Sequence, residues 1–568
     1  MSTPPYQDLK PNILSSSNLT NENTIAKLKI TMTKYIFVTG GVLSGLGKGV
    51  TAASIGNLLV SQGFNVWMQK FDQYLNVDAG TINPNKHGEV FVLDDGAETD
   101  LDLGHYERFI DTSLNRTSSV MTGQIYKAIL ENERAGKYLG QDIQVIPHVT
   151  DEVKLRITRA AKESKCDILI TEIGGTIGDY EGMHFVEAIR QMRHDVGQNN
   201  VLYVHVGFLP YLGASEELKS KPIQNSVHDL SGLGIQPDIL IARADHPVEK
   251  SMIKKIALFT GIDVESIIPL ETVDSIYKVP QILQKFNADK IVAAKLKLKI
   301  KNGSRTKWNE FIKKIEIDKK KTVKIALIAK YMGLKDTYFS VTESLKIAGI
   351  WQGVKTEVDW IDSEELENLP PKKIAAKFKE YDGILVPGGF GSRGIEGKIS
   401  AIKYAREHKK PFLGLCYGMQ LATIEFARHV AGLKDANTTE VNPKTSHPVI
   451  HIMPDQEKKM LKNDYGGTMR LGAYPCKIID NTKTAKAYGE KNISERHRHR
   501  YEFNNEYREI LTKKGLVISG TSPDDLLVEI IELKDHPFFI ATQFHPEFKS
   551  RPLKPHPLFY EFVKSALK

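Results

Sequence analysis

Residues 34–51 read Lys-Tyr-Ile-Phe-Val-Thr-Gly-Gly-Val-Leu-Ser-Gly-Leu-Gly-Lys-Gly-Val-Thr, an apolar run that leads into a glycine-rich loop. The run predicts a buried strand, and a helical pattern follows the loop. In this order, backbone N–H groups and a helix N-terminus can face an anion. The motif departs from the usual phosphate loop, because five residues rather than four separate Gly41 from Gly47 and glycine follows Lys48. A plain glycine-rich turn is the alternative, but the strand–loop–helix context favours a phosphate loop in which Lys48 contacts the β- and γ-phosphates.

Short β-rich runs alternate with helical patterns from residue 34 to about residue 298, and a second such pattern starts at Val323. Near-continuous apolar strands between helices are typical of a buried parallel sheet. The first half offers further strands at Val66–Phe71, Ile143–Pro147, Ile168–Glu172, Val201–Val206 and Ile239–Ala242, and the second at Lys324–Lys330, Thr356–Ile361, Gly383–Pro387 and Pro411–Leu415. We predict an α/β protein with two doubly wound domains.

The predicted domain boundaries follow from composition. Residues 1–31 lack an apolar period and are expected to form a disordered tail. Residues 32–298 form the phosphate-loop domain, residues 299–322 a basic linker, and residues 323–568 the second domain. At 568 residues the chain is too long for a single core.

Charge and cysteine content exclude several classes of protein. The net charge is +8, but the segment Lys295–Lys321 holds eleven Lys or Arg and three acidic residues, so it carries the whole excess. A nucleic-acid-binding protein more often spreads a basic face over a folded domain, and we expect no nucleic-acid partner. Three cysteines are too few for a disulfide framework and indicate a reducing compartment, the cytoplasm. The sequence contains no run of about 18 apolar residues, so we predict no membrane span.

Residues 414–418, Gly-Leu-Cys-Tyr-Gly, resemble a nucleophile elbow built on Cys416. Small flanking residues permit a strained turn, and the N–H of Tyr417 then becomes an oxyanion donor. A buried structural cysteine is the alternative. His545 and Glu547 lie two residues apart on a β-like stretch, so Glu547 can orient His545 and His545 can deprotonate the thiol. Residues 387–391, Pro-Gly-Gly-Phe-Gly, can supply a second oxyanion N–H.

Acidic residues offer candidate Mg²⁺ ligands, because ATP chemistry needs one or two carboxylates with phosphate oxygens and water. Glu172 ends a predicted strand, where ligands of open α/β sheets bind. The other candidates are Asp72, Asp94, Asp95, Glu98, Asp100 and Asp102. Most acids of residues 94–102 are expected on a solvated loop, and the residues alone do not choose among them.

Five strings show that the chain resembles the CTP synthase family, the glutamine-hydrolysing amidotransferases that make CTP. These are Phe-Val-Thr-Gly-Gly-Val (37–42), Asp-Gly-Ala-Glu-Thr-Asp-Leu-Asp-Leu-Gly-His-Tyr-Glu-Arg-Phe (95–109), Glu-Ile-Gly-Gly-Thr-Ile-Gly-Asp (172–179), Asp-Ser-Ile-Tyr-Lys-Val-Pro (274–280) and Arg-His-Arg-His-Arg-Tyr-Glu-Phe-Asn (496–504). The resemblance covers about residues 33–565. The irregular phosphate loop is the form found in this family.

The resemblance implies a role for each matching residue. The implied ATP contacts are Ser44, Gly45, Leu46, Gly47, Lys48, Gly49, Lys70, Asp102 and Arg243, and the implied Mg²⁺ ligands are Asp102 and Glu172. The implied UTP or CTP contacts are Ser44, Asp179, Glu181, Lys219, Lys221, Gln224 and Lys255. The implied triad is Cys416, His545 and Glu547, and the implied glutamine contacts are Gly389, Tyr417, Gln420, Glu440 and Arg500.

The resemblance also implies ligands and assembly. ATP, with Mg²⁺, phosphorylates the 4-oxygen of UTP, glutamine supplies ammonia through a thioester, and the ammonia travels internally to give CTP. GTP is implied as an allosteric activator, CTP as a feedback inhibitor, and a homotetramer as the assembly. Two other hypotheses are less favoured. Residues 218–224, Leu-Lys-Ser-Lys-Pro-Ile-Gln, and residues 95–109 argue against an amidase that activates a cofactor carboxylate with ATP, and the presence of every catalytic candidate argues against an inactive scaffold of the same fold.

Overall fold

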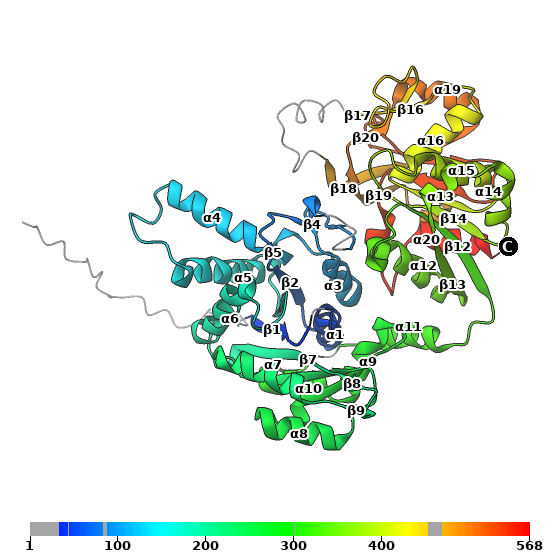
Figure 1. Ribbon diagram of the computed structural model, residues 1–568. Coiled ribbons are helices and arrows are strands. Elements are labelled where there is room, and N and C mark those ends of the chain that lie inside the picture. Colours follow the sequence, from blue (N-terminus) through cyan, green and yellow to red (C-terminus); the bar gives the residue numbers. More distant parts are fainter. Residues whose placement is uncertain (1–32, 44, 83–87, 302, 453–468, 568) are drawn as a thin grey trace, which may run out of the picture. The chain divides into compact units, whose positions relative to one another are not determined.

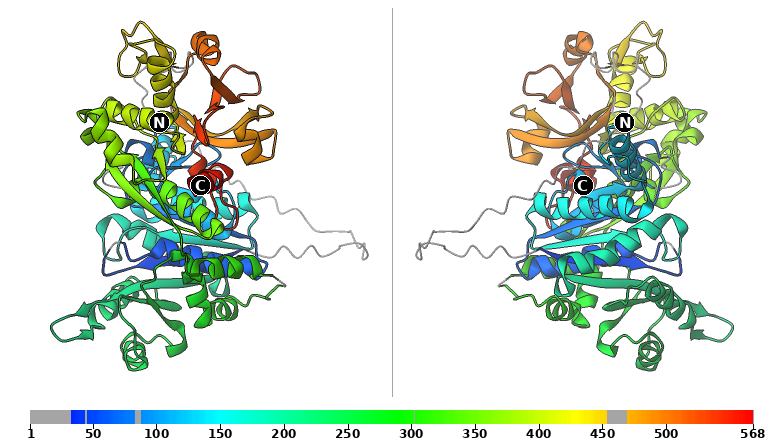
Figure 2. Two further views of the ribbon diagram at one scale, coloured as in Figure 1. Left: turned by 90° about the vertical axis from the view of Figure 1, so that its right-hand side faces the viewer. Right: turned by 90° about the vertical axis from the view of Figure 1, so that its left-hand side faces the viewer.

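The computed structural model describes residues 33–43, 45–82, 88–301, 303–452 and 469–567. The predicted tail, residues 1–31, and Ser44 of the phosphate loop lie outside the described residues. We call residues 33–298 the first half and residues 322–567 the second half (Figures 1 and 2).

The first half contains a seven-stranded sheet in which every described pair of neighbours is parallel. The strand order is β11 (Ile267–Glu271), β10 (Ile239–Ala244), β7 (Val201–Leu209), β1 (Lys34–Gly40), β6 (Ile168–Ile173), β2 (Val66–Asp72) and β5 (Ser119–Met121). Right-handed crossovers place helices on both faces of such a sheet. This confirms a doubly wound first half.

Helices cover both faces of this sheet. Helix α1 (Lys48–Ser61) packs with α3 (Asp102–Ile110) and α9 (Val279–Lys285), whereas α5 (Thr150–Ser164) packs with α6 (Met183–Val196). Figure 1 shows α1 and α5 on opposite sides of the strands. Further helices in the described part of this half are α4 (Thr122–Arg134), α7 (Lys221–Gly232), α8 (Lys250–Thr260) and α10 (Ala288–Lys295).

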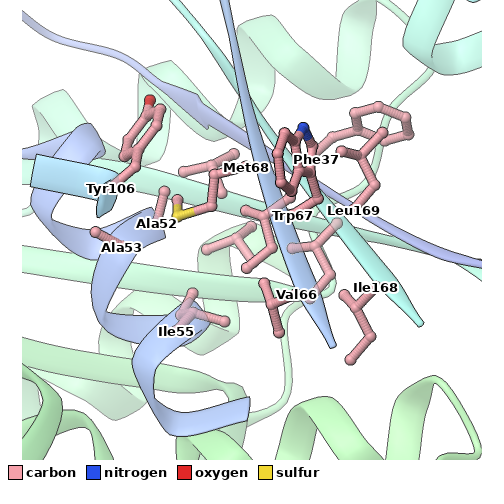
Figure 3. Close-up of a cluster of buried hydrophobic side chains, with 14 of the residues drawn as sticks. Phe37, Ala52, Ala53, Ile55, Val66, Trp67, Met68, Tyr106, Ile168 and Leu169 are labelled. Atoms are coloured by element: carbon pink, nitrogen blue, oxygen red, sulfur yellow. The ribbon is translucent and has the colours of Figure 1, made fainter. Parts of the chain in front are cut away.

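The core of the first half lies on both faces of the central strands, against α1 on one face and α5 and α6 on the other. Every residue of β2 is buried, and so are nearly all of β1. Figure 3 shows side chains of three adjacent strands: Val66 and Met68 lie toward Ala52, Ala53 and Ile55 of α1, whereas Phe37, Trp67 and Leu169 lie on the other side of the strands. Each large apolar side chain buried here contributes about 1.5–3 kcal/mol, so the strand edge that carries the phosphate loop rests on a rigid base.

One predicted strand of the first half is wrong. Residues Val145–Val149 form a helical turn, and the neighbour of β2 in the sheet is β5. The side chains of Val145 and Ile146 are about half exposed, and Pro147 has no N–H to donate to a ladder. The apolar run therefore lies at the surface of the protein and not inside the sheet. Strand β11 was not predicted from the sequence.

The second half contains a nine-stranded sheet. Its parallel part runs β13 (Lys355–Asp362), β12 (Thr322–Ala329), β14 (Gly383–Val386), β15 (Phe412–Leu415) and β23 (Phe539–Thr542). The sheet continues with β22 (Val528–Leu533), β21 (Leu516–Thr521), β18 (Arg470–Ile478) and β19 (Asn492–His499), which pair antiparallel. Helices α12 (Phe339–Gln352), α15 (Ile395–Glu407), α16 (Tyr417–His429) and α20 (Pro557–Ala566) belong to this half. The four predicted strands of this half are confirmed as β12, β13, β14 and β15. The antiparallel strands of this sheet were not predicted.

The basic segment between the halves is not a bare linker. Residues Thr306–Glu316 form helix α11, which buries Trp308, Phe311 and Ile312. Lys307, Lys313 and Lys314 of this amphipathic helix lie away from that buried face. Most of the excess positive charge lies on either side of the helix.

Candidate active sites

The glycine-rich loop between β1 and α1 forms a turn that only glycines adopt easily. Gly45 and Gly47 have φ values of 76° and 83°, in the left-handed region, and α1 begins at Lys48 directly after them. Val42 also has φ 83°, an unfavourable value for a β-branched residue, which is typical of strained functional loops. The loop therefore presents the N-terminus of a fourteen-residue helix to a ligand.

Lys48 lies at the base of a cavity of about 330 Å³, which is lined by the loop and by acidic residues. Its Nζ donates a hydrogen bond to the carbonyl oxygen of Gly175, at 2.7 Å. Burial lowers the pKa of Lys48, although the carboxylate of Glu172 opposes this shift. Arg243 reaches the same loop from β10, because its Nε donates to the carbonyl oxygen of Leu46 at 3.4 Å. Of the predicted ATP residues, residues 45–49, Lys70 and Asp102 line this cavity, and Arg243 contacts the loop beside it.

Two carboxylates meet beside the first turn of α1. A Cβ atom on Gly49 would lie 2.4 Å from Oδ1 of Asp102 and 3.2 Å from Oε2 of Glu172, so glycine leaves the space in which both oxygens converge. The described residues contain no cluster of three or more His, Cys, Asp or Glu side chains suited to a metal. Two carboxylates with phosphate oxygens and water are, however, the donor set that Mg²⁺ prefers. Asp102 and Glu172 fit that ion.

Lys70 balances part of this negative charge. Its Nζ contacts Asp102 and lies 3.4 Å from Oδ1 of Asp72 and 3.6 Å from Oδ1 of Asp100. Burial opposes its protonation, but Asp100, Asp102 and Asp72 together hold the pKa of Lys70 well above its ordinary value. Burial, and then the like charge of Asp102, raise the pKa of Glu172 to about 7. The hydroxyl of Tyr106, on α3, donates to Glu172 and fixes its orientation.

The expectation that most acids of residues 94–102 are solvated is wrong. Only Asp95 is exposed. Asp94 and Glu98 accept hydrogen bonds from Arg496 and Arg498 of the second half, at 2.6 and 2.7 Å. These arginines lie about 400 residues after the acids in the sequence, so the local sequence could not reveal the pairing.

The predicted UTP residues fall into two groups. Lys219, Lys221 and Gln224 lie together where β9 (Glu217–Leu218) leads into α7, and Lys255 on α8 lies near Glu217. The second group, Asp179 and Glu181, lies on an exposed segment after β6, where Oδ2 of Asp179 accepts from the N–H of Thr176 at 2.8 Å. No hydrogen bond or ion pair among the described residues links the two groups.

Cys416 forms the elbow between β15 and α16. Its φ and ψ are 50° and −100°, outside the favourable regions for a non-glycine residue. The flanking glycines are required by close packing, because a Cβ on Gly418 would lie 2.2 Å from the carbonyl oxygen of Val386 and one on Gly414 2.9 Å from Cβ of Ala541. The predicted strained turn at Cys416 is therefore present.

His545 and Glu547 complete a triad-like arrangement. Nδ1 of His545 lies 2.7 Å from Oε1 of Glu547, and Nε2 has no hydrogen-bond partner among the described residues. Although burial opposes protonation, Glu547 and Cys416 raise the pKa of His545 to about 10. His545 is the N-cap residue of a short 3-10 helix, Pro546–Lys549, that contains Glu547, so the predicted β-like stretch is wrong while the predicted contact is present.

The predicted glutamine residues surround Cys416. The N–H of Gly391 donates to Oε1 of Glu440 at 2.7 Å, and the hydroxyl of Tyr417 donates to the carbonyl oxygen of Gly391 at 2.9 Å. Nε2 of Gln420 donates to the carbonyl oxygen of Tyr501 at 2.8 Å, and Arg500 lies near Glu440. These contacts hold the Gly389 loop next to the nucleophile.

Residues from both halves line the cavity at Cys416. Cys416, His545 and Gly389 face Glu89 and Val90 of the first half across a space of about 90 Å³. Sequence analysis missed Glu89, Val90, Tyr331, Tyr338 and Gln543, and their positions carry no recognisable local motif. Gln543 precedes the predicted histidine by two residues, which was the one available signal.

Comparisons with known proteins cover almost the whole described chain. A family model described as CTP synthase N-terminus matches residues 34–298, and one described as glutamine amidotransferase class-I matches residues 333–565. CTP synthases of Carboxydothermus hydrogenoformans and Geobacillus kaustophilus are 57% and 55% identical, over 94% of this chain and 99% and 100% of their own lengths. A solved glutaminase domain of Trypanosoma brucei CTPS with bound acivicin is 40% identical, with a TM-score of 0.41, and covers 43% of this chain and 94% of that one.

Proposed function

The chain belongs to the CTP synthase family, and we propose that the residues assembled at its two sites carry out that reaction as follows. The protein converts UTP to CTP with nitrogen from glutamine, in pyrimidine biosynthesis. The observation that carries the assignment of roles is the cavity at Cys416, whose walls come from both halves of the chain.

In the second half, Cys416 attacks the side-chain amide carbon of glutamine. His545, held by Glu547, keeps the proton removed from the thiol and donates it to the departing ammonia. The backbone N–H groups of Gly389 and Tyr417 stabilise the oxyanion. Water then hydrolyses the thioester, with His545 as base, and releases glutamate. Gln420, Glu440 and Arg500 hold the amino and carboxylate groups of the substrate.

In the first half, the 4-oxygen of UTP takes the γ-phosphoryl group of ATP, which converts a poor leaving group into phosphate. Lys48 and Lys70 bind the phosphates, with the backbone of residues 45–49, and Arg243 lies near the adenine. Asp102 and Glu172 would hold Mg²⁺, which neutralises charge on the phosphates when it is bound. Ammonia then displaces phosphate and gives CTP.

Ammonia passes between the sites inside the protein. In water at neutral pH it is mostly protonated and is no longer a nucleophile. The cavity at Cys416 reaches Glu89 and Val90, which belong to the half that binds ATP. A route that begins at these residues avoids bulk solvent.

The nucleotide ligands follow from the same assignment. Lys219, Lys221, Gln224 and Lys255 bind the triphosphate of UTP, and Asp179 and Glu181 lie near the pyrimidine. CTP carries the same ribose and triphosphate, so it binds the same lysines and acts as a feedback inhibitor. GTP is the allosteric activator that accompanies this activity.

The active form is a homotetramer in the cytoplasm. Exposed apolar side chains support this assembly, because such side chains often mark protein–protein interfaces. Leu139 and Tyr180 are 92% and 93% exposed in the single chain. Other exposed apolar residues of this region are Leu130, Val145, Ile146, Leu155 and Met183. No helix among the described residues has the length and apolar character to span a bilayer. A reducing compartment keeps the thiol of Cys416 available.

The test is CTP formation by Cys416→Ala with glutamine or with ammonium as the nitrogen source. The variant should form no CTP from glutamine and should keep the parent rate with ammonium, because the ATP site lies in the other half. Cys476→Ala, which also removes a buried free thiol from the second half, is the matched control and should behave as the parent. Loss of both activities in Cys416→Ala alone would contradict the division of labour.

A further inference from the structure

Gln543 is a buried amide beside the nucleophile that the mechanism above does not use. It follows β23, is 1% exposed, and its Nε2 lies 3.7 Å from Sγ of Cys416. A distance of 3.7 Å is within the range for a hydrogen bond to sulfur, which is a larger atom than oxygen. The side chain therefore contacts the reacting atom itself.

Neighbouring groups fix which end of this amide faces the sulfur. Nε2 of Gln420 donates to the carbonyl oxygen of Tyr501 at 2.8 Å, and a carbonyl oxygen can only accept. The same Nε2 lies 3.4 Å from Oε1 of Gln543, which must then be the acceptor. The Nε2 atom of Gln543 is thereby turned toward Cys416. The orientation of both amides follows from the single fixed acceptor at Tyr501.

Two polar groups lie within hydrogen-bonding distance of the sulfur among the described residues. Sγ also lies 3.6 Å from the carbonyl oxygen of Arg498 on β19, which accepts a hydrogen bond from the thiol but cannot stabilise a thiolate. The titratable residues that line the cavity are Glu89, Tyr331, Tyr338, Arg498, His545 and Glu547. The side-chain amide of Gln543 is a neutral hydrogen-bond donor to this sulfur.

We propose that Gln543 donates a hydrogen bond to the sulfur of Cys416 and stabilises its thiolate, both before attack on glutamine and when the thiolate leaves during thioester hydrolysis. This inference rests on the proposed role of Cys416 as nucleophile. Hydrogen bonds to charged groups are stronger than those to neutral groups, so the donor favours the thiolate over the thiol and the thioester. Gln420 acts through Gln543 by holding the amide in the donating orientation.

Two variants test the donor. Gln543→Met keeps the length of the side chain and removes the N–H group, and Gln543→Glu keeps the shape and puts an oxygen where the donor was. We expect the kcat of glutamine hydrolysis to fall about tenfold in Gln543→Met and further in Gln543→Glu, with a smaller change in KM. Alkylation by iodoacetamide, followed against pH, should reach half of its maximal rate at a higher pH in both variants.

Controls separate this role from a structural one. Ammonium-dependent CTP formation should stay at the parent rate, which shows that each variant is folded. Thr423→Val removes another buried side-chain hydrogen bond in α16, at 3.0 Å to the carbonyl oxygen of Met419, and should leave the alkylation profile unchanged. If Gln543→Met and Gln543→Glu alkylate like the parent at every pH, Gln543 is not a donor to the thiolate. If Cys416→Ala still makes CTP from glutamine, the nucleophile itself is assigned wrongly.

Discussion

Replacing Glu107 by glutamine removes the negative charge at the centre of a buried ion cluster that joins the two halves. Glu107 lies on α3 of the first half and is fully buried. Its carboxylate accepts from Nη1 and Nη2 of Arg496 at 2.8 and 3.0 Å and from Nη2 of Arg551 at 2.6 Å. Oε1 also accepts from the N–H of Leu114 at 2.7 Å. Both arginines belong to the second half, so this carboxylate holds two cations from across the junction.

The size of the effect follows from what remains after the change. Glutamine keeps the shape but removes the ion-pair partner of Arg551 and leaves Arg496 with Asp94, whose side chain is 37% exposed. Removing one partner of a buried ion pair costs about 3–5 kcal/mol, because the remaining charge stays buried. Removing a charge at the partly exposed edge costs about 1 kcal/mol or less. Asp94→Asn is therefore the matched control.

The assay compares glutamate released with CTP formed. In the parent, the two amounts should be equal, because ammonia passes directly between the sites. In Glu107→Gln we expect more glutamate than CTP, normal CTP formation from ammonium, and a lower melting temperature; Asp94→Asn should differ little from the parent. Equal amounts of glutamate and CTP in Glu107→Gln, with an unchanged melting temperature, would show that this cluster does not hold the junction.

Three further predictions test individual side chains. Glu172→Ala should abolish CTP formation from either nitrogen source and keep glutamine hydrolysis, and an assay with ammonium that shows the parent rate would exclude the ligand role. Lys398→Met should stabilise the second half, because burial lowers the pKa of Lys398 from 10.5 to about 7 and its Nζ has no hydrogen-bond partner among the described residues. At about 1.4 kcal/mol per pKa unit, the gain in the free energy of unfolding is at most about 5 kcal/mol. Between pH 7 and pH 10.5 Lys398 is protonated in the unfolded state but not in the folded state, so the gain should be full below pH 7 and shrink as the pH rises toward 10.5. Calorimetry that finds the same difference in melting temperature between variant and parent at pH 6 and at pH 10 would contradict this prediction. Lys221→Ala should raise the UTP requirement and relieve CTP inhibition in parallel, and inhibition kinetics in which only one effect changes would contradict a shared triphosphate site.

Local sequence patterns predicted the parts of the molecule that are built locally. The run at Tyr35–Thr39 became a buried strand, and the glycines before Lys48 adopted the left-handed conformations that a phosphate loop needs. The elbow at Cys416 was predictable because close packing requires glycine on both sides of it.

Features that depend on distant residues could not be predicted in the same way. The pairing of Asp94 with Arg496 joins segments about 400 residues apart, and nothing in either segment specifies the partner. The apolar run at Ile143–Pro147 has the composition of a strand, but the side chains of Val145 and Ile146 are exposed at the protein surface. The donor at Gln543 is visible only once the fold brings Cys416, Gln420 and Gln543 together.

Transfer of nitrogen between the two sites is best measured with glutamine that carries nitrogen-15 in its amide group, in the presence of excess unlabelled ammonium at neutral pH. If ammonia released at Cys416 passes inside the protein to the ATP site, the CTP formed from glutamine should carry the label despite the unlabelled excess. The same mixture with Cys416→Ala should give unlabelled CTP alone. CTP from the parent protein whose label matches that of the mixed ammonium pool would show that ammonia leaves into solvent, and the internal route would be wrong.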